Sequence, residues 1–176
     1  MTDFAATKSM FELPDGVCYL DGNSLGPLPK AAAGRVGRTL TDEWGKLLIT
    51  SWNKAGWMDL PMKLGDRVAT LIGAEPGHVV LGDTLSIKVY QALASALEIN
   101  PARKVILSDS GNFPSDLYMA EGLIGTLGAG FALRVVAPDA VAALLSEDVA
   151  VLMLTEVDYQ TGRRHNMMAL TQKAHS

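Results

Sequence analysis

Short apolar runs alternate with amphipathic stretches through the second half of the chain. From residue 77 onward, apolar runs of strand length are separated by stretches in which apolar residues recur every three or four positions. Runs without polar alternation are typical of strands that are covered on both faces. This alternation predicts an α/β fold with a mostly parallel sheet. The predicted strands are 78–81, 104–107, 132–136 and 149–154, and the predicted helices are 84–97, 115–127, 139–145 and 167–174.

The first 76 residues follow a different pattern. Val17–Leu20 is a short β-prone run that stops at the turn residues Asp21-Gly22-Asn23-Ser24. Apolar residues at helical spacing then predict two helices on either side of a loop that contains two tryptophans. The helices are 30–48, with Val36, Leu40, Trp44 and Leu47 on one face, and 59–72, with Leu60, Leu64, Val68, Leu71 and Ile72 on one face; the loop is 51–57.

We therefore divide the chain into an N-terminal segment, 1–76, and an α/β segment, 77–176. The last predicted strand is followed by the start of a helix and by no further strand. Four or five strands can close a small sheet, so the pattern leaves two possibilities open: a small complete domain, or a chain that stops within a larger fold.

Composition excludes several classes of protein. Apolar residues make up 48% of the chain and charged residues 19%, which is unlike a disordered segment. The net charge of −4, without a basic run, gives no reason to expect a nucleic-acid or anionic-membrane partner. The lone cysteine, the acidic N-terminus and the lack of a long apolar run predict a cytoplasmic protein.

The ends of the predicted strands carry the candidate binding residues. Gly82-Asp83-Thr84-Leu85-Ser86 opens a helix, where free N–H groups and the helix dipole favour a phosphate. Ordinary capping by Asp83 or Thr84 is the alternative. Asn112-Phe113-Pro114-Ser115-Asp116 follows the next strand, so Phe113 can hold its ring over a flat ligand and Asp116 can accept a hydrogen bond. A hydrophobic staple with a proline start is the alternative there.

A third loop, Thr155–Gly162, follows the last predicted strand and holds Thr155 and Tyr159. Ordinary turn residues are the alternative interpretation. In open α/β sheets, ligands bind beyond the carboxyl ends of the strands, where all three junctions are expected. The sequence contains no nucleotide phosphate loop, no G-x-S-x-G elbow and no metal-ligand spacing among its three histidines. The Trp52–Trp57 stretch can wall a site for an aromatic substrate or pack in a core.

Three segments together resemble the kynureninase family. They are Tyr19-Leu20-Asp21-Gly22-Asn23-Ser24-Leu25-Gly26-Pro27, Ser51-Trp52-Asn53 with Gly56-Trp57, and Asn112-Phe113-Pro114-Ser115-Asp116-Leu117-Tyr118. The first and third are specific, and the resemblance extends over essentially the whole chain. It implies a three-layer, aminotransferase-like large domain with a mostly parallel sheet that is incomplete at its C-terminal side.

The family resemblance also implies a cofactor and a reaction. Kynureninases use pyridoxal 5′-phosphate (PLP), are usually homodimers, and hydrolyse the Cβ–Cγ bond of L-kynurenine to anthranilate and L-alanine in tryptophan catabolism; 3-hydroxykynurenine is the other substrate to consider. By position, the cofactor contacts are Leu85 and Ser86, with Thr84 beside them, and Phe113, Pro114, Ser115, Asp116 and Thr155. Ser24 and Trp52 match positions on the substrate side.

One departure limits what these 176 residues are expected to do. In the family, the Schiff-base lysine and the aspartate that pairs with the pyridinium nitrogen lie further along, beyond the position of Ser176. None of the eight lysines matches that position, so the resemblance assigns no catalytic residue and predicts no hydrolysis by this segment alone.

Two alternatives stay open. One is another PLP enzyme of the same fold, such as a cysteine desulfurase, although those usually carry histidine where this chain has Phe113. The other is a short non-catalytic protein that keeps a binding or dimerising surface.

Overall fold

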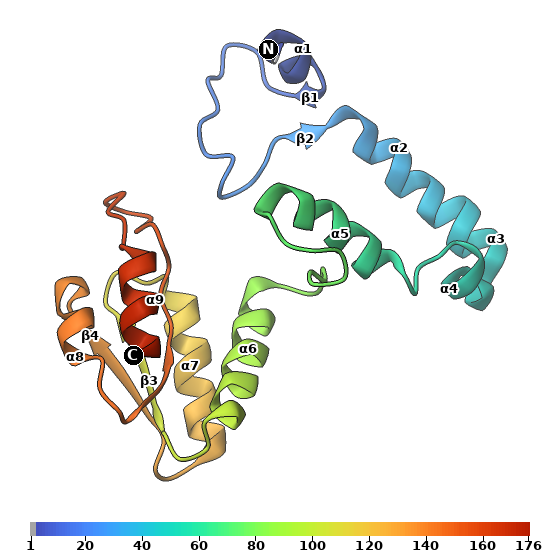
Figure 1. Ribbon diagram of the computed structural model, residues 1–176. Coiled ribbons are helices and arrows are strands. Elements are labelled where there is room, and N and C mark those ends of the chain that lie inside the picture. Colours follow the sequence, from blue (N-terminus) through green and yellow to red (C-terminus); the bar gives the residue numbers. More distant parts are fainter. Residues whose placement is uncertain (1–2) are drawn as a thin grey trace. The chain divides into compact units, whose positions relative to one another are not determined.

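The computed structural model describes residues 3–176. The chain forms two compact units that meet in sequence between Leu81 and Gly82, and each is described by itself (Figure 1). We call the part before this boundary the first unit and the part after it the second unit. Among residues 3–176, no helix is both long enough and apolar enough to cross a bilayer.

The second unit is built on a three-stranded parallel sheet. Its strands are β3 (Val105–Asp109), β4 (Ala132–Val136) and β5 (Val149–Leu152), in the order β4-β3-β5. β3 pairs in parallel with both neighbours. The predicted α/β class and parallel sheet are therefore confirmed for this unit. Within the described residues, β5 has β3 as its only strand partner and lies at an edge of the sheet.

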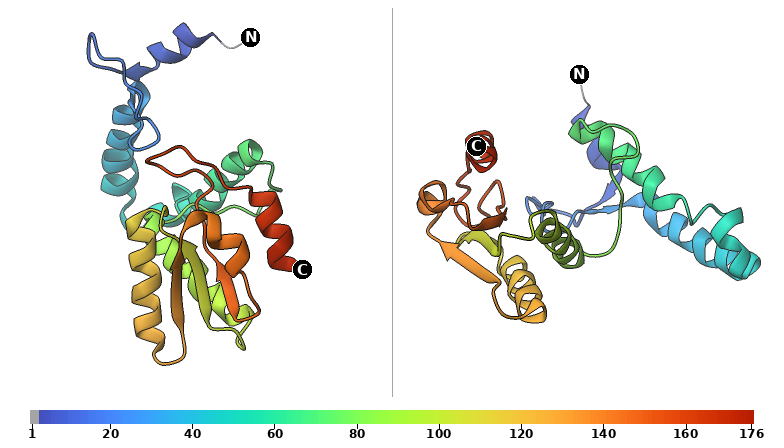
Figure 2. Two further views of the ribbon diagram at one scale, coloured as in Figure 1. Left: turned by 90° about the vertical axis from the view of Figure 1, so that its left-hand side faces the viewer. Right: turned by 60° about the horizontal axis from the view of Figure 1, so that its bottom comes forward.

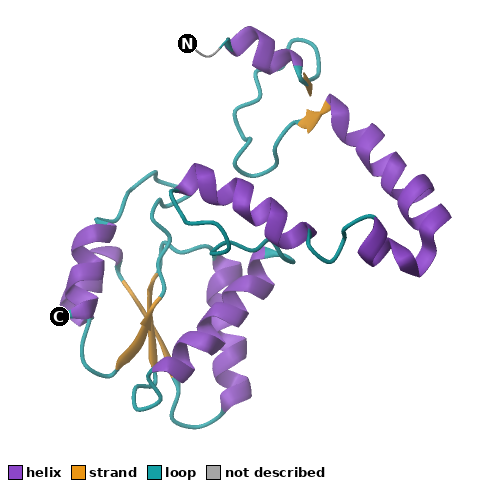
Figure 3. Cartoon of the chain, turned by 45° about the vertical axis from the view of Figure 1, so that its right-hand side comes forward, coloured by secondary structure: helices purple, strands orange, loops and turns teal. Residues whose placement is uncertain are grey.

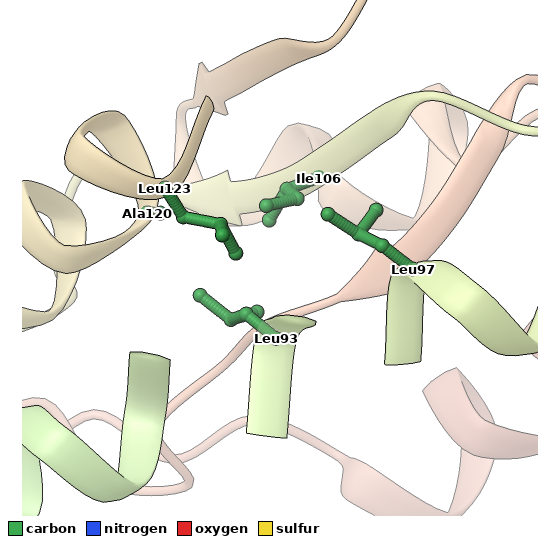
Figure 4. Packing of buried hydrophobic residues seen from close by; sticks show 5 residues of the cluster. All are labelled: Leu93, Leu97, Ile106, Ala120 and Leu123. Atoms are coloured by element: carbon green, nitrogen blue, oxygen red, sulfur yellow. The ribbon is translucent and has the colours of Figure 1, made fainter. Parts of the chain in front are cut away.

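Helices cover both faces of this sheet (Figure 2). α6 (Leu85–Ile99) and α7 (Pro114–Leu127) pack on one face, as the cluster in Figure 4 shows. α8 (Val141–Leu144), which follows a short 3-10 turn η3 (Pro138–Ala140), and α9 (Met167–His175) pack on the other face. The result is a three-layer arrangement of helices, sheet and helices.

The strand residues divide between two cores because successive side chains point to opposite faces. Ile106 is fully buried against the helices α6 and α7, where it meets Leu93, Leu97, Ala120 and Leu123 (Figure 4). Its neighbours in β3 pack on the other side, in a cluster of Val105, Leu107, Val141, Val149 and Leu170. All five residues of β3 are buried; the first three form the apolar run seen in the sequence, and the last two are the buried polar residues Ser108 and Asp109.

The first unit consists of helices and one small antiparallel ladder (Figure 3). The helices 30–48 and 59–72 are confirmed, but the first contains a π-helical segment and ends in short turns. The elements are α1 (Phe4–Ser9), β1 (Phe11–Glu12), β2 (Leu28–Pro29), α2 (Lys30–Arg38), η1 (Thr39–Trp44), α3 (Gly45–Leu47), η2 (Leu48–Thr50), α4 (Ser51–Lys54) and α5 (Leu60–Ile72).

Two predicted strands are wrong. Neither Val17–Leu20 nor 78–81 is assigned to a strand, and neither pairs with one. The first instead leads into the 21–24 turn, and the second lies along α5, where the Leu81 N–H donates to the Pro61 carbonyl oxygen at 3.2 Å. An apolar run forms a strand only when a partner strand pairs with its backbone N–H and C=O groups. In the first unit, strand pairing occurs between β1 and β2 instead.

The predicted buried faces of the two helices are also wrong in part. Val36, Leu40 and Trp44 are more than half exposed, although they share the predicted face. On α5 the buried residues are Gly65 and Ala69, because the backbone of Val79 lies directly against Gly65. Small side chains mark this contact, so a pattern of large apolar residues does not reveal it.

The ion pair between Arg134 and Asp148 links β4 to the turn before β5. Arg134 Nη2 lies 2.5 Å from Asp148 Oδ2, and this hydrogen bond, with one from Ser146, lowers the pKa of Asp148 from 3.8 to about 2. A carboxyl whose pKa is lower in the folded state stabilises the fold above its unfolded pKa, and that contribution disappears as the pH falls through the folded pKa.

We therefore expect Asp148→Asn to lower the melting temperature at neutral pH. The difference from wild type should shrink as the pH falls from about 4 to below about 2, because Asp148 is increasingly protonated in the folded state as the pH passes its pKa of about 2. Thermal unfolding followed by circular dichroism across this range measures it. A difference that stays constant with pH would contradict the role of the ion pair.

Candidate functional site

The candidate site of the second unit lies at the carboxyl ends of β3 and β5. The chain runs from β3 outward to β4 and then returns to the opposite side of β3 to form β5. This reversal makes the gap beyond β3 and β5 a topological switch point, where ligands bind in open α/β sheets. The loops after both strands are the second and third junctions that the sequence singles out.

Asn112 joins the two loops across this gap. Its buried side chain accepts the Thr155 hydroxyl proton at 2.7 Å and the Phe113 N–H at 2.8 Å through Oδ1. Its Nδ2 donates to Ser108 Oγ at 3.1 Å, and Ser108 donates to the Met153 carbonyl oxygen at 2.8 Å. The structure thus brings Phe113 and Thr155 together, although they lie far apart in sequence. The sequence singled out Asn112 only as part of its motif.

Phe113 stands at the start of α7 with its ring half exposed. It occupies the N-cap position, Pro114 begins the helix, and Ser115 and Asp116 follow in the first turn. Phe113 is 49% exposed, and its ring meets that of Tyr159 edge-on at a centroid distance of 5.0 Å. Asp116 is buried, and its negative charge suits the first turn of a helix. The proline start of the helix is present, and Phe113 beside it is partly exposed.

The start of α6 offers backbone donors at the same edge of the sheet (Figure 1). Both α6 and α7 run antiparallel to β3, so both begin at its carboxyl end. Thr84 caps α6 by accepting the Ile87 N–H at 3.4 Å. The N–H groups of Leu85 and Ser86 have no partner inside the helix, because the first turn never does. Capping by Thr84 therefore coexists with an open set of donors.

Lys88 is a charged neighbour of this helix start that the sequence did not single out. Its Nζ lies 3.9 Å from Asp83 Oδ2 and 3.0 Å from Gln91 Oε1. A Cβ built at Gly82 would lie 2.4 Å from this ammonium, so the side chain folds back over the turn before α6. The only signal in the sequence is its position four residues after the helix cap. An ammonium group here adds positive charge to a helix end that already favours anions.

A buried pair, Asp109 and His165, lies beside the Phe113 loop and was also missed. Asp109 ends β3, and its Oδ2 lies 2.5 Å from His165 Nε2. The sequence gives no signal for this pair, because 56 positions separate the two residues. The sequence shows no metal-ligand spacing for His165. Among residues 3–176, no group of three or more His, Cys, Asp or Glu side chains is placed to hold a metal ion.

Ser24 and Trp52, the two predicted substrate-side residues, both belong to the first unit. Ser24 lies exposed in a turn, where its N–H donates to the Asp21 carbonyl oxygen at 3.1 Å. The Tyr19 hydroxyl closes this turn by donating to the carbonyl oxygens of Leu25 and Asp21, at 2.5 and 3.2 Å. The D-G-N-S-L-G segment is therefore a fixed turn and not a strand end.

Trp52 lies on the short helix α4, so the prediction of a loop over 51–57 is wrong in its first half. Ser51 is the first residue of this helix, and its buried hydroxyl lies 2.7 Å from the carbonyl oxygens of both Glu43 and Leu48. The half-exposed Trp52 ring meets Trp57 edge-on at 5.9 Å.

Glu43 in turn fixes Trp57. Its Oε2 accepts the Trp57 indole N–H at 2.6 Å, and its Oε1 lies 2.7 Å from Arg35 Nη1. These contacts, led by the Trp57 hydrogen bond, lower the pKa of Glu43, which keeps it charged at neutral pH. The Trp52–Trp57 pair is thus a supported aromatic surface, with one ring left accessible.

The residues of the second unit fit the chemistry of PLP. A helix start suits its phosphate, and the partly exposed aromatic ring of Phe113 suits its flat ring. Asp116, buried in the first turn of α7, and the hydroxyl of Thr155 are polar groups at the same edge. The side chain of Leu85 is apolar, so its backbone N–H is the group that can donate to a phosphate.

Comparison with known proteins finds kynureninases among the relatives of this chain. No family model matches the chain. The chain is 49% identical over 176 residues to a kynureninase from Pseudomonas fluorescens, with 97% of this chain aligned. It is 48% identical to a kynureninase from Burkholderia pseudomallei and 47% identical to one from Burkholderia mallei, with 96% of this chain aligned. The chain spans 42% of the length of each of these relatives.

Proposed function

Because the chain is a homologue of the kynureninases along nearly its whole length, we propose that it forms the part of a kynureninase that binds the phosphate and ring of PLP and contacts the substrate. The proposed reaction is hydrolysis of the Cβ–Cγ bond of L-kynurenine, or of 3-hydroxykynurenine, in tryptophan catabolism. The identity of 47–49% to kynureninases from different genera is the observation that carries this proposal.

The proposal gives each side of the second-unit site a role. The first turn of α6, with Leu85, Ser86 and neighbouring Thr84, binds the phosphate through backbone N–H groups and a hydroxyl. The Phe113 ring packs on the pyridine ring, and Pro114 fixes the start of the helix that carries it. Ser115, Asp116 and Thr155 supply polar contacts around the ring. When PLP is bound, it stabilises negative charge at the substrate's Cα, and that chemistry belongs to the cofactor.

Two residues of the first unit also have a proposed role. We assign Trp52 to the aromatic ring of the substrate and Ser24 to its polar groups. Their local supports, Trp57 and the Tyr19-closed turn, hold both residues before substrate arrives, which reduces the entropy lost on binding. We further propose an aminotransferase-like fold, a cytoplasmic homodimer, and a working division between 1–76 and 77–176.

Kynurenine turnover tests the proposal directly. The full-length natural protein, purified with PLP, should convert L-kynurenine to equal amounts of anthranilate and L-alanine, followed by anthranilate fluorescence and amino-acid analysis. Protein from which PLP has been removed should lose this activity and regain it when PLP is returned. A protein that binds PLP, leaves kynurenine intact and releases sulfur from cysteine would instead support the desulfurase alternative. A protein that binds neither PLP nor kynurenine would support a non-catalytic role.

A further inference from the structure

Asp109 uses both of its carboxylate oxygens to connect two loops at the candidate site. Its Oδ2 pairs with His165 Nε2 at 2.5 Å, and its Oδ1 accepts the Gly111 N–H at 2.6 Å. The two paired side chains are only 3% and 9% exposed. A buried carboxylate is costly unless its oxygens are paired, so this arrangement holds the two loops together.

His165 belongs to a closed hairpin, residues 156–165, which we call the 156–165 hairpin. An isolated antiparallel bridge joins Val157 to Arg164, and the His165 N–H donates to the Glu156 carbonyl oxygen at 2.9 Å. At its tip, Asp158 Oδ1 accepts the N–H groups of Gln160 and Thr161, both at 2.8 Å. The hairpin is therefore internally fixed, and moving His165 moves the hairpin with it.

The hairpin packs directly on the loop that carries Phe113. A Cβ built at Gly111 would lie 2.6 Å from Asp158 Oδ2 and 3.1 Å from Asp109 Oδ1, so only glycine fits this contact without displacement. Tyr159 then meets the Phe113 ring at 5.0 Å and an interplanar angle of 61°. The Tyr159 ring supports one edge of Phe113 and leaves the ring half exposed.

We propose that Asp109 and His165 are positioning residues that clamp the 156–165 hairpin on the Phe113 loop, so that Tyr159 fixes the ring on which the cofactor packs. The inference rests on the proposed function, because it needs Phe113 to contact PLP. Neither Asp109 nor His165 lies within the motifs that the chain shares with the family.

Two substitutions of His165 carry the same amide group on side chains of different length, so they test whether contact with Asp109 is what matters. Glutamine places its amide nitrogen about as far from the backbone as histidine Nε2, so His165→Gln keeps a donor for Asp109. Asparagine carries the same amide group on a shorter side chain, so His165→Asn loses the contact. In the full-length protein, we expect His165→Gln to bind PLP within about twofold of wild type and His165→Asn to bind it about tenfold more weakly.

If His165 acts through the Phe113 ring, the effects of substituting the two residues on PLP affinity should not be additive. In a Phe113→Ala background, His165→Asn should weaken PLP binding by no more than about twofold, because the ring that the hairpin supports is gone. Arg134→Ala is the control: it breaks the ion pair with Asp148, lowers the melting temperature, and should leave PLP affinity unchanged in both backgrounds. Spectroscopic PLP titration and thermal unfolding without PLP measure the two effects separately.

If His165→Asn does not fold, Gly111→Ala replaces it in the same two backgrounds, because the added methyl group displaces the hairpin, and His165 with it, without altering the side chain of Asp109 or His165. The same coupling is expected. Equal losses of PLP affinity with and without Phe113, or no loss in either, overturn the clamp and leave the proposed function standing. A wild-type protein that does not bind PLP overturns the proposed function, and the clamp with it.

Discussion

Ser86→Asp should weaken PLP binding by about a hundredfold or more without destabilising the protein. Position 86 lies in the first turn of α6, beside the backbone N–H groups proposed to bind the phosphate. A carboxylate there occupies the same positive end of the helix and repels the phosphate, and like charges in contact cost several kcal/mol. The same carboxylate interacts favourably with the helix dipole, so the fold itself should gain about 0.5 kcal/mol.

Opposite effects on binding and on stability make this substitution informative. Ser95→Asp places the same charge at an exposed position further along α6 and should leave PLP affinity unchanged. PLP titration and thermal unfolding of the cofactor-free variants measure the two quantities. If Ser86→Asp binds PLP as tightly as Ser95→Asp does, the phosphate lies elsewhere.

Gly65→Ala should destabilise the first unit by about 3 kcal/mol, the upper end of what overpacking usually costs. A Cβ at this position would lie 1.9 Å from the Val79 carbonyl oxygen and 2.6 Å from its carbonyl carbon. Both atoms are backbone, so no side-chain rotation relieves the contact. Either α5 or the extended segment beside it must move, and the Leu81–Pro61 hydrogen bond is then lost.

Gly37→Ala is the matched control in the same unit. Gly37 lies in α2, and a Cβ there would have no neighbour within 4 Å. Alanine is favoured over glycine inside a helix by about 0.5–1 kcal/mol, so this substitution should stabilise the protein. Urea unfolding followed by circular dichroism compares the two variants. Equal effects would show that helix propensity, and not the close contact with Val79, governs position 65.

Local features of the candidate site were predicted from sequence because their causes are local. Pro114 begins a helix by its fixed backbone angle, and the N-F-P-S-D-L-Y motif places Phe113 and Asp116 on either side of that start. The apolar run of β3 predicts a buried strand without any knowledge of its partners. The parallel order of strands then places the loops after β3 and β5 at one edge.

Other features depend on partners that no local pattern specifies. The runs Val17–Leu20 and 78–81 look like strands, but each lacks a neighbouring strand, and the second packs on α5 instead. The exposed face of α2 carries the periodicity of a buried helix, because periodicity records which residues share a face and not whether anything covers it.

The sequence by itself determined the α/β class, the parallel sheet, the helix starts that flank the site and the kynureninase-like motifs, because each depends on neighbours a few positions apart. Tertiary structure alone decided the strand order β4-β3-β5 and the switch point it creates. It also decided the bridge from Asn112 to Thr155 and the pair of Asp109 with His165. These contacts join residues 43 and 56 positions apart, and only packing brings such residues within hydrogen-bond distance.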